Sequence, residues 1–113
     1  MKFFNTITDK VLNDVKNEPV LKDCVDKLYV VKNLDGDDNL ILVLNFSKKL
    51  RVDEKHKIED YISNKYNIEV NNYNYAYNYM FKDLVRCNII KLPDASVDTF
   101  LKNFVVREEI LWI

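Results

Sequence analysis

Residues 27–46 read KLYVVKNLDGDDNLILVLNF, and this stretch decides the fold class. Two runs rich in Val, Leu and Ile, Lys27–Asn33 and Asn39–Phe46, flank the segment Asp35–Asp38, which holds the only glycine of the chain. An Asp-Gly pair between two such runs is typical of a β-hairpin, because Gly36 can take the positive φ that a tight turn needs. Leu40–Leu44 is apolar at every position, which predicts a central strand in a sheet covered on both faces.

Apolar residues at helical spacing predict helices on both sides of this hairpin. The first helix is expected over residues 5–17. Pro19 then stands in the first turn of a second short helix whose apolar positions continue to Leu28, with an extended segment as the alternative. A further helix is predicted over residues 52–66, with Asp53 as its N-cap. Its expected inward-facing side chains are Ile58, Tyr61, Ile62 and Tyr66.

Residues 72–88 fit two templates. Aromatic side chains alternate from Tyr73 to Phe81, as in a strand with one aromatic face. The same segment also places apolar residues at i, i+3, i+4, i+7 and i+8 from Tyr77, as in a helix. The helical pattern continues further along the chain and accounts for more residues, so we predict a helix over residues 75–87.

The remaining elements complete an α+β domain. The expected strands besides the hairpin are Asn67–Asn71, Asn88–Leu92 and Val105–Ile113, and a helix is expected to begin at Pro93. We therefore predict one domain over residues 1–113, with a small, mostly antiparallel sheet of three to five strands packed by three to five helices.

Composition narrows the cellular setting. The polar residues directly after Met1 predict no signal peptide, and no apolar run is long enough to span a bilayer, so a cytoplasmic location and reduced thiols at Cys24 and Cys87 are expected. The net charge of −1 argues against a dedicated duplex-DNA binder. Phe, Tyr, Met, Ile, Asn and Lys make up 52 of the 113 residues, whereas Gly, Ala, Arg and Pro make up 8, which indicates an AT-rich genome.

The patterns for common catalytic sites are missing from the sequence. One glycine cannot build a phosphate-binding loop or a nucleophile elbow. The single histidine, His56, could be a general base oriented by Asp60, but a surface pair on a polar helix face is the favoured interpretation. Cys24 and Cys87 are expected to fill the core. Neither zinc-ligand spacing nor a complete calcium loop is present, so we predict no metal, no cofactor and no enzyme activity.

Two surfaces remain as candidate binding sites. On a helix over 75–87, four residues that are common in interface hot spots share the outward face: Tyr75, Tyr79, Lys82 and Arg86. Alternatively, codon bias has placed these tyrosines on a surface without a binding role, and we give this interpretation the same weight. A secondary basic patch comprises Lys48, Lys49, Arg51, Lys55 and Lys57. Acidic residues are interleaved there, so an ordinary charged helix face is the favoured interpretation.

The sequence thus predicts a non-enzymatic macromolecular binding module. We expect a small protein–protein interaction protein that acts as an inhibitor or adaptor and that comes from a phage or mobile element with an AT-rich genome. The alternative is a single-stranded nucleic-acid-binding protein that stacks bases on tyrosines and tracks phosphates with the basic patch. The partner's identity, the oligomeric state and the role of Trp112 stay open.

Overall fold

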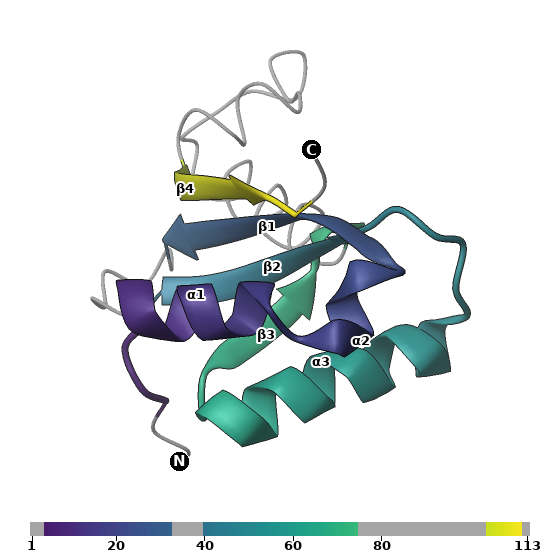
Figure 1. The fold of residues 1–113 in the computed structure, drawn as a ribbon, viewed down its shortest axis with the longest axis horizontal. Coiled ribbons are helices and arrows are strands. Elements are labelled where there is room, and N and C mark those ends of the chain that lie inside the picture. Colours follow the sequence, from purple (N-terminus) through teal and green to yellow (C-terminus); the bar gives the residue numbers. More distant parts are fainter. Residues whose placement is uncertain (1–3, 33–39, 75–103, 112–113) are drawn as a thin grey trace, which may run out of the picture.

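The computed structural model describes residues 4–32, 40–74 and 104–111 (Figure 1). Within these ranges the chain forms three helices and four strands. In chain order they are α1 (Asp9–Lys16), α2 (Pro19–Lys22), β1 (Val25–Lys32), β2 (Leu40–Phe46), α3 (Val52–Tyr66), β3 (Glu69–Asn72) and β4 (Val105–Ile110). The expected elements over residues 75–87, 88–92 and from Pro93 onward lie outside the described residues.

The strands form one sheet in the order β3-β2-β1-β4. β1 is antiparallel to β2, with Leu28 opposite Leu44 and Val30 opposite Leu42, so the two strands of the predicted hairpin are confirmed. β1 is also antiparallel to β4. β3, however, is parallel to β2, because α3 carries the chain back to the end of the sheet at which β2 began. The α+β class is confirmed, but the sheet is mixed.

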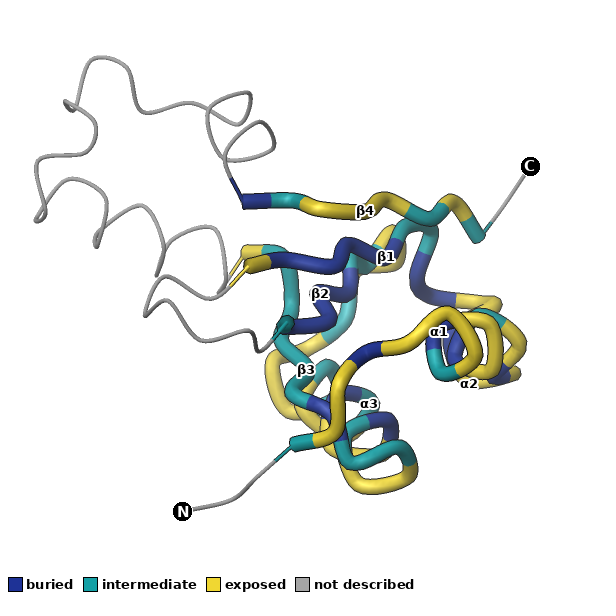
Figure 2. Tube along the Cα trace, turned by 90° about the vertical axis from the view of Figure 1, so that its left-hand side faces the viewer, coloured by how far each residue is buried: buried dark blue, intermediate teal, exposed yellow. Residues whose placement is uncertain are grey.

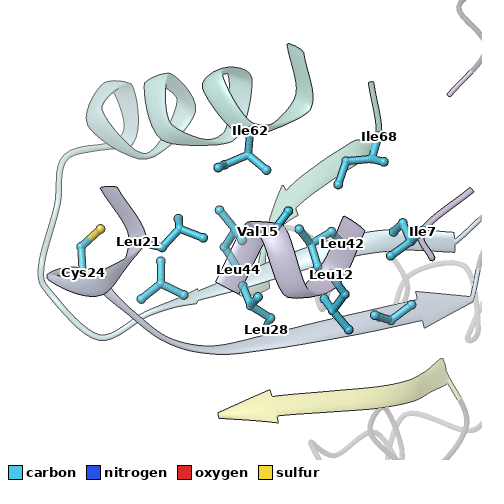
Figure 3. Close-up of a cluster of buried hydrophobic side chains, with 12 residues drawn as sticks. Ile7, Leu12, Val15, Leu21, Cys24, Leu28, Leu42, Leu44, Ile62 and Ile68 are labelled. Atoms are coloured by element: carbon cyan, nitrogen blue, oxygen red, sulfur yellow. The ribbon is translucent and has the colours of Figure 1, made fainter. Parts of the chain in front are cut away.

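All three helices lie on one face of the sheet, where they enclose the main core (Figure 2). Figure 3 shows side chains from α1, α2 and α3 directed at those of the two central strands. The most deeply buried members of this cluster are Val15, Leu21, Val25, Leu28, Leu42, Leu44, Ile62 and Ile68. The apolar stripes read from the sequence are therefore the surfaces that meet at the sheet.

The opposite face of the sheet is buried as well. Tyr29, Val31, Ile41 and Val43 alternate with the core residues of β1 and β2, and each is buried. β2 lies between β3 and β1 in the sheet. The prediction of a central strand covered on both faces is confirmed.

The N-terminal helices are shorter than expected. α1 begins at Asp9 because the hydroxyl of Thr8 accepts a hydrogen bond from the Val11 N–H at 3.2 Å, which caps the helix there. α2 keeps Pro19 in its first turn but ends at Lys22. Val25 already belongs to β1, so the extended alternative is right for the segment that ends at Leu28.

Helix α3 is confirmed over its whole predicted length, whereas its cap and inward face differ. Glu54, and not Asp53, completes the N-terminus, because its carboxylate accepts a hydrogen bond from the Arg51 N–H at 3.3 Å. Ile62 is buried as expected, but Tyr61 is exposed and Glu59 is buried in its place. The helix ends at Tyr66, and its C-cap residue Asn67 has a φ of 52°.

The last two strands agree with their predictions within a few residues. β3 is Glu69–Asn72, where Asn67–Asn71 was expected, since the left-handed turn at Asn67 delays the strand. β4 is Val105–Ile110 and lies within the predicted range 105–113. No helix in the described ranges combines the length and apolar character needed to cross a bilayer.

Candidate functional site

The four residues of the predicted partner-binding face, Tyr75, Tyr79, Lys82 and Arg86, lie outside the described residues, as does Cys87. The helix on which that face depends therefore stays a prediction. The candidate sites below are built from residues in the three described ranges.

The secondary basic patch lies on the loop after β2 and on the first turns of α3: Lys48, Lys49, Arg51, Lys55 and Lys57. Part of its charge is already compensated. The Arg51 guanidinium lies 3.1 Å from Glu54 and 3.5 Å from Asp53. The ammonium of Lys55 lies over the ring of Phe46, 5.9 Å from its centre. Arg51 is therefore ion-paired within the chain, and the choice between a charged helix face and a phosphate-binding surface stays a prediction.

His56 pairs with Glu59, one turn further along α3. Its Nδ1 lies 2.7 Å from Glu59 Oε2. Asp60, the partner considered from the sequence, is exposed. Glu59 is only 5% exposed, while the imidazole of His56 is more than half exposed. The structure thus contains a buried carboxylate that is hydrogen-bonded to an exposed histidine.

This pair borders a hollow between α3 and β3 with a volume of about 300 Å³. The residues that line it are His56, Glu59 and Asp60 from α3, and Val70, Asn71 and Asn72 from β3. The second carboxylate oxygen of Glu59, Oε1, is buried and has no hydrogen-bond partner in the described part of the chain. A buried acceptor without a donor is uncommon in folded proteins, because its lost hydration is not compensated.

The chemistry of the hollow favours binding over catalysis. A histidine oriented by a carboxylate can act as a general base, but it needs a nucleophile or substrate proton within reach. The other lining residues are an aspartate, a valine and two asparagines, and none of them is a serine, threonine, cysteine or lysine. Across residues 4–32, 40–74 and 104–111, no three His, Cys, Asp or Glu side chains lie close enough together to hold a metal ion.

A second buried carboxylate, Glu18, has a different environment. It is 5% exposed and accepts hydrogen bonds from Lys65 Nζ at 2.7 Å, from the Tyr66 hydroxyl and, at 3.4 Å, from the Tyr61 hydroxyl. The bond from Lys65, followed by that from Tyr66, lowers the pKa of Glu18. Burial and the same carboxylate raise the pKa of Tyr66 to about 12. This cluster joins the start of α2 to the end of α3, and we interpret it as structural.

Cys24 is also structural. Its side chain is buried in the main core, and the thiol donates to the carbonyl of Val20 at 3.1 Å. Burial, with a smaller effect from Asp23, raises the pKa of this thiol. A raised pKa disfavours the nucleophilic thiolate, so the expectation that Cys24 fills the core is confirmed.

Strand β4 carries an exposed apolar pair. Val106 is 48% exposed and Ile110 is 54% exposed. Ile110 lies opposite Lys27, whereas Val106 lies at an irregularity in the pairing with β1, between Val105 and Arg107. The three charged residues between them are paired within the chain. Arg107 contacts Asp9 and Glu109, Glu109 also contacts Lys16 at 3.0 Å, and Glu108 contacts Lys27 at 3.3 Å. β4 therefore combines exposed apolar side chains with compensated charges.

Sequence reasoning missed Glu59 because residue type was given more weight than helical position. At 100° per residue, Glu59 lies about 60° from the middle of the stripe formed by Ile58, Ile62 and Tyr66, whereas Tyr61 lies about 100° from it on the other side. Hydrophobicity then selects Tyr61, whereas the structure buries Glu59. The available signal was His56 three residues earlier, a spacing at which side chains meet on a helix.

No protein-family model matches the chain, and no curated protein or solved structure matches it either.

Proposed function

We propose that this chain is a non-enzymatic module that binds another protein in a stoichiometric complex, as an inhibitor or adaptor, and that β4 receives an extended segment of the partner. The observation that carries the proposal is the exposed apolar pair Val106 and Ile110 on the last strand of the sheet as described. An edge strand offers backbone donors and acceptors to which an extended peptide can add, while its side chains select the sequence.

The backbone of β4 has the orientation that strand addition needs. The N–H of Leu111 points to β1, because it donates to the carbonyl of Asp26 at 2.8 Å. In a regular antiparallel strand the backbone groups of neighbouring residues point in opposite directions, so those of Glu108 and Ile110 point away from β1. In the described part of the sheet β4 pairs with β1 alone. The outward groups are therefore placed to pair with an added strand.

The side chains of β4 favour an apolar partner segment. Glu108 and Ile110 share one face of the regularly paired part of β4, and Val106 lies at the irregularity that precedes it. We propose that apolar residues of the partner strand cover Val106 and Ile110. Each is about half exposed, and full burial would stabilise the complex by about 1 kcal/mol per residue. The charges of Arg107, Glu108 and Glu109 are already paired, so the partner strand would leave no unpaired ion at the contact.

The test compares an edge variant with a matched surface variant. Val106→Lys combined with Ile110→Lys should abolish capture of the partner from an extract of the source organism. Val52→Lys, at a position that is 68% exposed on α3, should leave capture unchanged. With the captured partner purified, calorimetry should show at least a tenfold weaker Kd for the edge variant.

Two outcomes would contradict the proposal. Equal binding by a folded edge variant, with folding checked by circular dichroism, would exclude β4 as the contact. Loss of binding only in the Tyr75→Ala, Tyr79→Ala double variant would move the contact to the predicted tyrosine face and would leave β4 without this role.

A further inference from the structure

The sequence of β4 is complementary to itself when two copies run antiparallel. Residues 106–110 read VREEI, and Glu108 stands at the middle of this run. With Glu108 of one copy opposite Glu108 of another, Arg107 of each copy lies opposite Glu109 of the other. Val106 of each copy then lies opposite Ile110 of the other. Apolar residues and opposite charges that face one another across an antiparallel pair stabilise it, so every cross-strand pair except the central one is favourable.

The backbone of β4 allows this alignment. β4 is the outermost strand of the described sheet, at the top in Figure 1, and the backbone groups of Glu108 point away from β1. In an antiparallel pair, two residues whose backbone groups point at each other exchange both of their hydrogen bonds. Glu108 can therefore pair with its own copy across a two-fold axis. The irregularity of β4 lies between Val105 and Arg107, so this central pair falls in regular strand.

The charges of β4 match a second copy of the chain. Arg107 and Glu109 lie on the face towards α1, to which both are joined by ion pairs, and they contact each other at 2.6 Å. Across the two-fold axis each would meet its opposite charge again, which extends these pairs into one network. The like-charged central pair is offset by Lys27, whose Nζ lies 3.3 Å from Glu108 Oε1, because each copy brings one such lysine.

We infer that two copies of this chain associate through β4, with a two-fold axis at Glu108, so that their described sheets join into one. A contact of this symmetry uses the same patch on both copies, and it covers Val106 and Ile110 of each. The contact is one short strand, which predicts a weak dimer that forms at high protein concentration. The dimer occupies the edge offered to a partner, so a partner would have to displace the second copy. This last consequence rests on the proposed function, whereas the dimer itself does not.

Sedimentation equilibrium of the purified full chain, with no other protein present, tests the dimer. The mean mass should rise with protein concentration towards twice that of one chain. Val106→Lys combined with Ile110→Lys should weaken the association at least tenfold, whereas Val52→Lys, at an exposed position on α3, should change it less than twofold. Should the double variant fail to fold, Ile110→Lys alone still provides the test and should weaken the association severalfold.

Cross-linking tests the position of the axis. Residues that exchange both backbone hydrogen bonds have Cα atoms about 5.5 Å apart, within the range of about 4.4–6.8 Å that a disulfide bridges. Mild oxidation of Glu108→Cys should therefore give a disulfide-linked dimer much faster than oxidation of Val52→Cys. The original chain, which contains Cys24 and Cys87, gives the background rate.

Three results would overturn the inference. They are a mass that stays at one chain at every concentration, an unchanged association in a folded edge variant, and cross-linking of Glu108→Cys no faster than that of Val52→Cys. A chain that stays monomeric but captures a partner through β4 would exclude the dimer and leave the proposed function standing. A dimer that captures no partner would do the reverse.

Discussion

The cluster around Glu18 gives the sharpest prediction about stability. Glu18→Gln keeps the size of the side chain and removes its charge, and because Glu18 makes no side-chain capping bond to α2, the substitution leaves the helix cap intact. Buried hydrogen bonds to charged groups contribute about 1.5–3 kcal/mol each. The contribution of Lys65 is smaller, because this side chain is half-exposed and solvent screens its charge. In the variant, the glutamine carbonyl can still accept the hydrogen bond from Tyr66. We expect Glu18→Gln to lower the free energy of unfolding by about 2 kcal/mol.

Urea unfolding at neutral pH measures this loss. With a slope of about 2 kcal/mol per M, the midpoint of Glu18→Gln should fall by about 1 M. Asp60→Asn, which changes an exposed carboxylate, serves as the control and should leave the midpoint nearly unchanged. An unchanged midpoint for a folded Glu18→Gln protein would show that the cluster does not stabilise the junction of α2 and α3.

The pH dependence separates the charge of Glu18 from its packing. Its folded pKa lies below the ordinary value of 4.5, so the charged carboxylate stabilises the fold above that value, and this stabilisation is lost as the pH falls through the folded pKa. The difference in stability between the original protein and Glu18→Gln should therefore shrink between about pH 5 and pH 2. A difference that stays constant over this range would refute the electrostatic explanation and attribute the effect to packing.

Three further predictions concern other parts of the structure. Because Asn67 has a positive φ, Asn67→Ala should destabilise the fold by about 1 kcal/mol, while Asn67→Gly should be neutral or stabilising. Thermal unfolding compares the two variants, and an equal loss of stability in both would contradict the role of φ. Burial raises the pKa of Cys24, so its alkylation in the native protein should be much slower than in urea, and equal rates measured by mass spectrometry would refute this. Single-stranded oligonucleotides should bind weakly at physiological salt, because Arg51 is already paired with Glu54. Fluorescence titrations test this, and tight binding with a steep salt dependence would instead support a nucleic-acid-binding protein.

The sequence was most informative where a single periodicity extends over many residues. The stripe formed by Ile58, Ile62 and Tyr66 located α3, and the uninterrupted run Leu40–Leu44 identified the central strand. Local signals were weaker at the boundary between α2 and β1, where Val25 and Leu28 fit a helix and a strand equally well. Pairing with β2 and β4 settles that conflict, and pairing between distant segments leaves no periodic pattern in the sequence.

The candidate site was beyond sequence reasoning for the same reason. The hollow at Glu59 exists because α3 packs against β3, and the parallel course of β3 follows from where α3 ends at Tyr66. The β4 surface could be foreseen only in part. The apolar residues Val106 and Ile110 predicted a strand, but only the sheet order shows that this strand lies at an edge of the sheet formed by the described residues.

The antiparallel pairing of β4 with β1 has a consequence for synthesis of the protein in the cell. The ion pair between Lys16 and Glu109 cannot form until Glu109, 93 residues further along the chain, has been synthesised. At a translation rate of about 5–20 residues per second, the flank of β1 that β4 later covers stays open for roughly 4 to 16 s, because β4 ends 78 residues after β1. During that interval β1 is the outer strand of the described sheet in place of β4, and its open backbone can pair with a neighbouring copy or be bound by a chaperone.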